Sequence, residues 1–447
     1  MNSKFTFAVT SMGCKANLAD SHALEAELRS LGGAPAGDGE SADLHLLNTC
    51  TVTDNADKEA AQILRKAKAS LTVATGCFAE VDPERLRAAG EKSGAPFRVL
   101  RNAAKPELKA LVAEWLAGTL DEQKKIWNGD RVEWHSAILP NSLEARAASS
   151  EARTRAFLKV QDGCNAFCAY CVIPLARGRS RSLPAARVVA EVRTLVATGV
   201  KEVVLTAIHA ADYEADGLGF TGLVEKVLRE TSVPRLRLTS LDPAEIPDSL
   251  LDLMARESRL CPHFHVSLQS ANERVLRAMK RGYGAGAIEN RLAAIAERLS
   301  HAYVGMDVIA GFPGESDEEF EDSFARLERL PWTRAHVFPF SVRQKTAAAR
   351  LVSEGLAVPA PKVAERARRL RELSDRKFGA AATARAGSVM EILTENKEAR
   401  WEGRSVSTGH SRSFFKVVIP GKHPANELRR VRILGRLGSD SLKGELV

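Results

Sequence analysis

Three cysteines stand within eight residues of one another, Cys164, Cys168 and Cys171, in the spacing C-x3-C-x2-C. Thiolates this close on one loop are typical ligands of an iron–sulfur cluster. Three ligands leave one iron of a four-iron cluster open to a small molecule. The alternative is structural zinc, which normally takes four protein ligands. The next candidate ligands, His209 and Cys261, lie far along the chain. The loop therefore favours an iron–sulfur centre.

This loop follows the first strand of a repeated strand–helix pattern, and the pattern predicts the fold of residues 155–383. Alternating strands and helices indicate a parallel sheet, so the fold class is α/β. Six strand–helix units are too few for an eight-stranded barrel and suit a partial (β/α)6 barrel, closed by a helix over Glu365–Phe378. Barrel active sites lie where the strands end, as this loop does. The predicted strands are 157–161, 202–206, 235–240, 263–268, 303–310 and 335–340.

Residues 1–105 repeat the pattern with a second set of cysteines. Strands over 5–10, 44–47 and 71–75, each followed by a helical pattern, predict a doubly wound parallel sheet. Cys14, Cys50 and Cys77 each come just after one strand, beside Gly or Asn. The carboxyl ends of parallel strands share one edge, where open α/β sheets bind ligands. We therefore expect a second shared metal centre, the alternative being three unrelated buried thiols.

The remaining segments differ in character. Residues 106–154 are interpreted as a linker, with one helical pattern followed by polar, alanine-rich sequence. Residues 384–447 contain short strands and turns that predict a small antiparallel β-barrel. From Gly387 onward there are eleven Lys and Arg against seven Asp and Glu. This excess favours RNA binding, although a solvated surface would look similar. We expect this barrel to be removable without loss of the cluster chemistry.

The composition limits the class of protein. Lys and Arg exceed Asp and Glu by eight, which permits an anionic partner. Apolar runs are only strand-sized and no long apolar signal region is present, so we expect a cytoplasmic protein with no membrane partner. Seven cysteines, an odd number in a long chain, argue against a disulfide scaffold. Cys261 belongs to neither triplet and is expected to be structural.

The cysteine motif, with an aromatic residue before its last cysteine, resembles the radical S-adenosylmethionine (SAM) superfamily. The run CNAFCAYCVIPLARGRSRS further resembles the cluster loop of the methylthiotransferase family. Other matching runs are GCKAN, NTCTV, TGC, HFHVSLQS, DVIAGFPGES and FPFSVRQKTAAA. GCKAN, NTCTVTDNADKEA and SLQS are similar to the branch that acts on threonylcarbamoyladenosine beside the anticodon. The branches acting on isopentenyl-adenosine or on a ribosomal protein usually differ after the first cysteine or at Ser270.

The resemblance implies the chemistry of both triplets. Cys164, Cys168 and Cys171 would hold a [4Fe-4S] cluster that binds SAM and cleaves it to a 5′-deoxyadenosyl radical, which removes hydrogen from C2 of adenosine 37 of tRNA. The N-terminal triplet would hold a second [4Fe-4S] cluster, whose open iron carries the sulfur to be inserted. A second SAM would supply the methyl group. The implied partners are the tRNA anticodon stem-loop, held by a TRAM-like C-terminal barrel, an electron donor such as flavodoxin or ferredoxin, and a sulfur source.

Further site residues are expected around the cluster loop. The candidates for binding SAM are Tyr170, Thr206, Ser240 and Gly311. The candidates for contacting tRNA phosphate form an alternating basic series, Arg177, Arg179 and Arg181. The alternative for the SAM candidates is that they only pack in the core. The alternative for the three arginines is that they are solvated surface charges. His209 and His265 are expected to be ordinary strand histidines.

The sequence also departs from the family pattern. Ala207 and Ala271 stand where glycine is usual, and Val342 and Lys345 stand where proline and glycine are usual. No departure removes a cysteine, so they affect loop geometry and substrate fit more than the reaction. They motivate one rival, an iron–sulfur RNA-binding protein without catalysis. The other rivals are methylthiotransferases that act on isopentenyl-adenosine tRNA or on a ribosomal protein.

Overall fold

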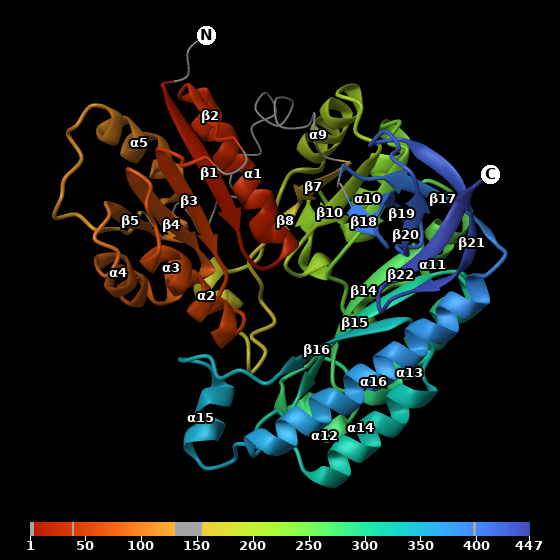
Figure 1. Ribbon diagram of the computed structural model, residues 1–447. Coiled ribbons are helices and arrows are strands. Elements are labelled where there is room, and N and C mark those ends of the chain that lie inside the picture. The colour runs from red at the N-terminus through yellow and green to blue at the C-terminus, as the bar shows by residue number, and fades with distance from the viewer. Residues whose placement is uncertain (1–3, 38–39, 130–153, 397–398) are drawn as a thin grey trace.

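The computed structural model describes residues 4–37, 40–129, 154–396 and 399–447 (Figure 1). Three units follow one another along the chain: an N-terminal unit up to residue 129, a central unit over 154–385, and a C-terminal unit over 389–447. In Figure 1 they are coloured red to orange, yellow-green to light blue, and blue. No helix among the described residues combines the length and the apolar character needed to cross a membrane.

The N-terminal unit is a parallel sheet with helices on both faces. Its strands are β1 (Phe5–Ser11), β2 (Gly33–Pro35), β3 (Leu44–Thr49), β4 (Leu71–Gly76), β5 (Phe97–Leu100) and β6 (Ile126–Trp127). Its helices are α1 (Lys15–Ser30), α2 (Asp54–Arg65), α3 (Cys77–Val81), α4 (Pro83–Glu91), the 3-10 helix η1 (Asn102–Glu107) and α5 (Leu108–Leu116). The strand order is β2-β1-β3-β4-β5-β6. The order reverses between β1 and β3, which is where sheets of this kind leave a crevice.

Part of the predicted linker 106–154 belongs to this sheet. Helix α5 buries Leu108, Leu111 and Val112 in the same core as Phe5. Strand β6 extends the sheet beside β5, with Trp127 opposite Leu100. The sequence signal was the i, i+3, i+4 spacing of the three apolar residues of α5. Residues 130–153 lie outside the described residues.

The central unit contains the second αβ series. Its strands are β7 (Arg155–Lys159), β8 (Gln161–Asp162), β9 (Arg181–Ser182), β10 (Glu202–Thr206), β11 (Glu214–Ala215), β12 (Leu218–Gly219), β13 (Arg235–Leu238), β14 (His263–Gln269), β15 (Tyr303–Ala310) and β16 (Arg334–Pro339). Its helices are α8 (Ile173–Arg177), α9 (Ala185–Ala197), η3 (Ala210–Asp212), α10 (Phe220–Glu230), η4 (Pro243–Glu245), α11 (Asp248–Arg256), α12 (Glu273–Ala278), α13 (Ala285–Arg298), α14 (Asp317–Arg329), α15 (Ala347–Ser353) and α16 (Ala360–Arg385).

The long strands of the central unit form two parallel sheets, β13-β10-β7 and β14-β15-β16. Isolated bridges link them, Leu236 to Leu260 and Leu241 to Val266. The α/β class with parallel strands is therefore confirmed. Closure into a partial (β/α)6 barrel goes beyond these pairings and stays a prediction.

Side-chain alternation gives β14 and β15 two different faces. Val266, Met306 and Val308 are buried in the core that the surrounding helices complete. The intervening residues, His265 and Asp307 among them, point to the opposite face, because successive strand residues alternate. That face carries the polar side chains that line the site described below.

The C-terminal unit is rich in strands, as predicted. They are β17 (Val389–Thr394), β18 (Ala399–Trp401), β19 (Arg404–Ser411), β20 (Lys416–Pro420), β21 (Leu428–Leu437) and β22 (Ser441–Leu446). Strand β17 pairs with both β21 and β19, so the sheet closes on itself. Most pairs are antiparallel, and β20 with β22 is parallel.

The packing of this unit argues against the expectation that it can be removed without loss of the cluster chemistry. Arg235 and Arg237 of β13 are each 1% exposed. They donate hydrogen bonds to the carbonyls of His410 (3.1 Å), Arg412 (2.9 Å) and Ser411 (3.2 Å). Phe378 of α16 and Tyr303 of β15 share the core of the β unit. The C-terminal unit thus completes the central unit.

Truncation at Gly387 is therefore expected to abolish SAM cleavage as well as to weaken tRNA binding. It removes the carbonyl acceptors of Arg235 and Arg237 and exposes to water the apolar surface of Tyr303 and Phe378, at a cost of roughly 25 cal/mol per Å². The melting temperature and the anaerobic release of 5′-deoxyadenosine by the truncated chain measure the effect. Wild-type values for both would show that the C-terminal unit is separable after all.

Candidate active site

The three N-terminal thiols come together at one edge of the first sheet. Cys14 precedes α1, Cys50 follows β3 and Cys77 begins α3, directly after β4. Gly13 has a positive φ of 88°, and a Cβ there would lie 2.5 Å from the Cys50 sulfur. Gly76 has a φ of 99°, and a Cβ there would lie 2.3 Å from the carbonyl oxygen of Thr49. Only glycine allows these loops to approach so closely.

The environment of these thiols suits metal ligands. Cys50 and Cys77 are buried and Cys14 is exposed. Burial, followed by the neighbouring Cys77, raises the pKa of Cys50 to about 12. A thiolate here therefore needs a compensating positive charge, which a bound metal provides. In the described part of the chain, neither complete cysteine triplet has its three sulfurs within 4.8 Å of one another, whereas Cys164 forms such a group with His209 and Asp212.

The second triplet lies on the loop between β8 and α8. Gly163, before Cys164, has a φ of 73°, and a Cβ there would lie 2.0 Å from the carbonyl oxygen of Arg179. Burial raises the pKa of Cys171 to about 12. The thiols accept hydrogen bonds from the Ala166 amide to Cys164 (3.4 Å), from the Ile173 amide to Cys171 (3.4 Å), and from Arg281 to Cys168 (3.2 Å), and His209 also hydrogen-bonds to Cys164. Such bonds to sulfur tune the potential of a cluster.

Arg281 is a site residue that the sequence interpretation missed. Its guanidinium forms an ion pair with Asp242 and donates to the Ser267 carbonyl (2.9 Å), which orients it toward Cys168. A cation held beside a ligand thiolate stabilises the negative charge that the thiolate carries. Arg281 stands 113 residues from Cys168, and no local pattern marks it.

A cavity of about 150 Å³ lies beside the loops that carry Cys50 and Cys171. Val52 and Thr53, just after Cys50, line one side, and Tyr170, just before Cys171, lines another. The remaining lining residues come from β14, β15, β16 and the segment after β16: Gln269, Asp307, Ile309, Phe338, Pro339, Phe340 and Ser341. A molecule in this cavity would contact the loops of both triplets.

The other residues expected to bind SAM do not line this cavity. Thr206 is the last residue of β10, Ser240 lies two residues after the end of β13, and Gly311 directly follows β15. Thr206 is buried and donates to the Val204 carbonyl (3.4 Å). Ser240 has a φ of 61°, a strained conformation for a residue other than glycine. Their contact with SAM stays a prediction, as does that of Tyr170.

The three arginines after the cluster loop lie in three different environments. Arg177 is 1% exposed and cannot contact tRNA phosphate, so that expectation is corrected. Arg181 is largely buried and donates to the Arg177 carbonyl (2.8 Å) and to Asp162 (3.3 Å). Arg179 is exposed, with its guanidinium 5.6 Å from the centre of the Phe167 ring. Of the three, only Arg179 remains a candidate for tRNA.

Arg177 belongs to a buried charge network, which we define as Asp20, Lys105, Lys159, Asp162 and Arg177. Asp20 and Lys105 come from the N-terminal unit, and the other three residues come from the central unit. Asp20 accepts from Lys105 (2.9 Å) and Arg177 (3.1 Å) and also pairs with Lys159. Asp162 pairs with Lys159 (2.7 Å) and Arg177 (2.9 Å). The network joins the two units directly behind the thiols.

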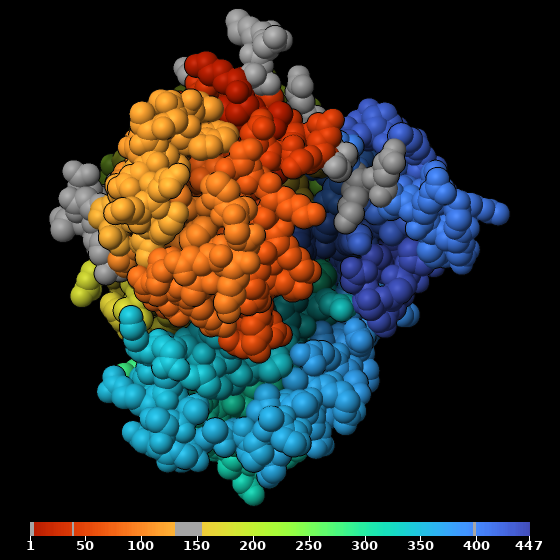
Figure 2. All heavy atoms as spheres, turned by 60° about the vertical axis from the view of Figure 1, so that its left-hand side comes forward, coloured from red at the N-terminus to blue at the C-terminus, as the bar shows by residue number. Residues whose placement is uncertain are grey.

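A second contact joins the two units on the far side of the cavity. Arg343 pairs with Asp57 (2.7 Å) and donates to the Thr51 carbonyl (3.2 Å). The Ser341 hydroxyl accepts from the Asp54 amide (3.0 Å). In Figure 2 the orange N-terminal unit rests on the cyan part of the central unit. The segment after β16 therefore closes the cavity against the loop of Cys50.

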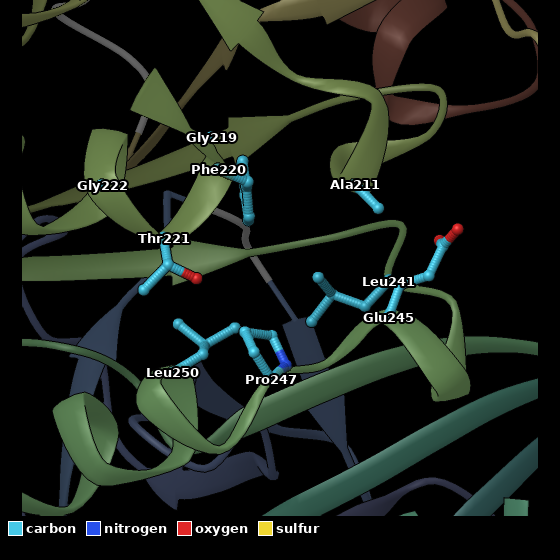
Figure 3. Close-up of a pocket in the computed structure, with 9 residues that line it drawn as sticks. All are labelled: Ala211, Gly219, Phe220, Thr221, Gly222, Leu241, Glu245, Pro247 and Leu250. Atoms are coloured by element: carbon cyan, nitrogen blue, oxygen red, sulfur yellow. The ribbon is translucent and has the colours of Figure 1, made fainter. Parts of the chain in front are cut away.

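A different cavity, of about 350 Å³, lies beside η3 and α10 (Figure 3). The apolar side chains of Leu241, Pro247 and Leu250 gather in it, while the Glu245 carboxylate points away. That carboxylate is 2.6 Å from His209, which was expected to be a strand histidine but lies in the loop after β10. This cavity shares no lining residue with the cavity beside the cysteine loops, so the two are separate.

The chain resembles known proteins in both of its α/β units. Residues 158–327 match the Radical SAM superfamily, and residues 6–95 match the uncharacterized protein family UPF0004. The chain is 34% identical to the threonylcarbamoyladenosine tRNA methylthiotransferase MtaB of Aquifex aeolicus, over 83% of this chain and 88% of that one. It is 33% identical to the protein of the same name from Chlamydia pneumoniae, over 99% of both chains.

Two further likenesses bear on the family and the fold. A tRNA-2-methylthio-N(6)-dimethylallyladenosine synthase of Erythrobacter litoralis is 31% identical, over 99% of this chain and 97% of that one. The radical SAM methyltransferase TsrM of Kitasatospora setae has the same fold, with a TM-score of 0.55 and 16% identity over 83% of this chain and 85% of that one.

Membership in the Radical SAM superfamily implies SAM and a [4Fe-4S] cluster, and the loop thiols Cys164, Cys168 and Cys171 fit such a cluster in number, spacing and hydrogen bonding. The resemblance seen in the sequence is thereby confirmed. The protein is an enzyme that acts on tRNA, and the chain belongs to the radical SAM tRNA methylthiotransferase family.

Proposed function

We propose that this enzyme inserts a methylthio group at C2 of N6-threonylcarbamoyladenosine 37, next to the anticodon of tRNA. Cys164, Cys168 and Cys171 would hold the [4Fe-4S] cluster that binds SAM, and Cys14, Cys50 and Cys77 would hold a second [4Fe-4S] cluster. When bound, these groups supply a 5′-deoxyadenosyl radical, the sulfur and, from a second SAM, the methyl group. An electron donor such as flavodoxin or ferredoxin and a sulfur source complete the reaction, which we place in the cytoplasm with its tRNA.

One observation carries this proposal: a single cavity touches the loops of both thiol triplets. C2 of adenine has no acidic proton, so no side chain could activate it by acid–base chemistry. A base in the cavity would lie between the two centres, with Tyr170 and Phe338 as apolar walls. The same walls exclude water, which protects a reactive intermediate. Arg281 and the loop amides hold the thiols in place.

The proposal is tested by mass spectrometry of tRNA nucleosides from a strain that lacks the gene. We expect 2-methylthio-N6-threonylcarbamoyladenosine to disappear and the unthiolated nucleoside to accumulate. The reconstituted enzyme should restore the product on an anticodon stem-loop that carries N6-threonylcarbamoyladenosine. Loss of the isopentenyl-adenosine derivative, or of methylthiolation on a ribosomal protein, would assign the substrate to another branch. Absence of SAM cleavage by reconstituted protein would favour a binding protein without catalysis.

The C-terminal unit offers a surface for the tRNA backbone. On β21, Val431 and Ile433 point inward, while Arg430 and Arg432 are exposed on the outer face. Alternation of this kind places both guanidinium groups on one side of the strand. Phosphate contacts by such groups release counterions, so binding weakens steeply as salt rises.

The double substitution Arg430→Gln and Arg432→Gln is expected to weaken tRNA binding without changing SAM cleavage in the absence of RNA. Each lost phosphate contact lowers the slope of log affinity against log salt by about one. Filter binding over a series of salt concentrations measures that slope. Arg256→Gln, an exposed arginine of α11, is the matched control and should leave it unchanged. An unaltered slope in the double variant would place the tRNA elsewhere.

A further inference from the structure

A group of titratable side chains beside the cavity is not explained by the cluster chemistry; Asp307 lines the cavity, and the side chain of His336 is 57% exposed. His265, Asp307 and His336 stand on the adjacent strands β14, β15 and β16, with one ligand atom of each within 4.8 Å of the others. The Asp307 carboxylate is 3.2 Å from Nε2 of His265 and 3.3 Å from Nδ1 of His336. Asp307 therefore orients both imidazoles. The second ring nitrogen of each has no hydrogen-bond partner among the described residues.

Lys15 reaches the same place from the N-terminal unit. It is half-buried, lies close enough to Asp307, Arg155 and Arg237 to interact electrostatically, and stands 5.7 Å from the centre of the Phe414 ring. Arg155 is paired with Glu395 and Arg237 with Glu202. Lys15 has no ion pair or side-chain hydrogen bond within the described residues. Its ammonium group is therefore the unpaired charge of this region.

The position of Lys15 is electrostatically unfavourable in its own helix. It is the first residue of α1, where the helix dipole presents its positive end. A cation there is repelled by the dipole and by Arg237 and Arg155, while Asp307 and Cys14 attract it less strongly. Such a placement is expected where a ligand supplies the missing negative charge. The cationic surroundings also disfavour a divalent metal on the His265–Asp307–His336 group, although imidazoles and a carboxylate are metal ligands elsewhere.

We propose that Lys15, His265 and His336 form a carboxylate-binding site, and that it receives the threonyl carboxylate of the N6 substituent. This inference rests on the proposed function. Asp307 lines the cavity, and it precedes Ile309 by two residues, so it lies roughly 7 Å deeper along β15. The carboxylate of the substituent is separated from the adenine ring by several bonds. With C2 held at the thiol end, the substituent would extend inward toward these residues.

The site therefore distinguishes substrates by charge. A threonylcarbamoyl group brings the anion that Lys15 lacks, whereas an isopentenyl group is apolar and would leave the ammonium and the imidazoles without a partner. Hydrogen bonds to charged groups contribute about 1.5–3 kcal/mol each, which corresponds to roughly a tenfold to a hundredfold difference in affinity. Lys15, His265 and His336 are positioning and specificity residues in this scheme.

The test compares two anticodon stem-loops that differ only in the threonyl group of adenosine 37, which carries either the free carboxylate or a neutral carboxamide. Fluorescence anisotropy with the reconstituted full-length enzyme measures both affinities. The wild type is expected to bind the carboxylate form at least tenfold more tightly. Lys15→Met and His336→Phe should each lose most of this preference. Lys109→Met, an exposed lysine of α5, is the matched control and should keep it.

Additional measurements distinguish failure of the carboxylate-site inference from failure of the proposed function. Lys15→Arg, which keeps the positive charge, should retain most of the preference that Lys15→Met loses, and the iron content of both variants is measured beside their affinities. Equal affinity of the wild type for the two stem-loops, with product formed on the carboxylate form, would overturn this inference and leave the proposed function intact. Stoichiometric Zn²⁺ binding that His336→Phe abolishes would assign the group to a cation and overturn it too. Absence of methylthiolated product from the wild type would overturn the proposed function itself.

Discussion

Cys168→Ala is expected to abolish the reductive cleavage of SAM and, with it, all methylthiolated product. The substitution leaves two thiols on the loop, and it removes the sulfur that accepts the hydrogen bond from Arg281. Two ligands no longer fix a cluster with one open iron at the strand ends. Anaerobic incubation of the reconstituted variant with SAM and a strong reductant measures 5′-deoxyadenosine, which should fall to the level without enzyme.

Cys50→Ala should separate the two halves of the reaction. It removes a ligand of the N-terminal triplet and leaves the cluster loop unchanged, because the two triplets lie on different sheets. We expect this variant to cleave SAM to 5′-deoxyadenosine but to insert no sulfur into tRNA. Iron content should fall by about half in either variant if each cluster holds four irons.

Cys261→Ala is the matched control for both substitutions. Cys261 is buried in the central unit and belongs to neither triplet. This variant should keep both activities and the full iron content. Product formation by Cys50→Ala at the wild-type rate would mean that the N-terminal thiols are not the site of sulfur insertion.

Asp20→Asn is expected to lower the free energy of unfolding by about 3–5 kcal/mol, because removing one partner leaves buried charges uncompensated. Asp20 is 2% exposed and meets Lys105, Lys159 and Arg177. Asparagine keeps the shape of the side chain and removes its charge. The midpoint of urea unfolding of the anaerobic holoenzyme, followed by tryptophan fluorescence, measures the loss.

The charge state of Asp20 determines the direction in which the free energy of unfolding changes with pH. Burial alone would raise the pKa of Asp20, but Lys105, Lys159 and Arg177 outweigh it and hold that pKa below its usual value. The stabilisation is therefore fully present above the unfolded pKa of about 3.9 and is lost only as the pH falls below it. Asp248→Asn, an exposed aspartate paired with Arg291, should leave the midpoint unchanged. Equal midpoints for both variants would refute the role of the network.

The sequence was sufficient to predict the long strands and to place Cys14, Cys50 and Cys77 at the ends of three of them. Buried parallel strands are continuous apolar runs in the sequence, so β4 and β10 could be recognised from it. A cysteine directly after such a strand must lie at the edge of the sheet where the strands end. Strands β2 and β6 were missed because two or three residues carry no periodicity. The α5 segment was assigned to a linker although its apolar spacing indicated a packed helix.

The contacts between units could not be predicted. Arg177 and Arg179 look alike in the sequence, yet one is buried against Asp20 and the other is exposed. Which arginine meets a carboxylate depends on how two separately folded sheets are placed against each other. Arg281 and Arg343 were missed for the same reason. Their partners, Cys168 and Asp57, lie 113 and 286 residues away.

The packing of the C-terminal unit against the central unit has a consequence for synthesis of the chain. Arg237 finds its acceptor at Ser411, 174 residues later. At about 5–20 residues per second, the ribosome needs roughly 10–35 s to make that stretch. Throughout this interval the central unit lacks the strands that cover Arg235 and Arg237 and that complete the core around Tyr303, while the N-terminal sheet can already fold. We therefore expect the nascent central unit to depend on chaperones until the last strands are released.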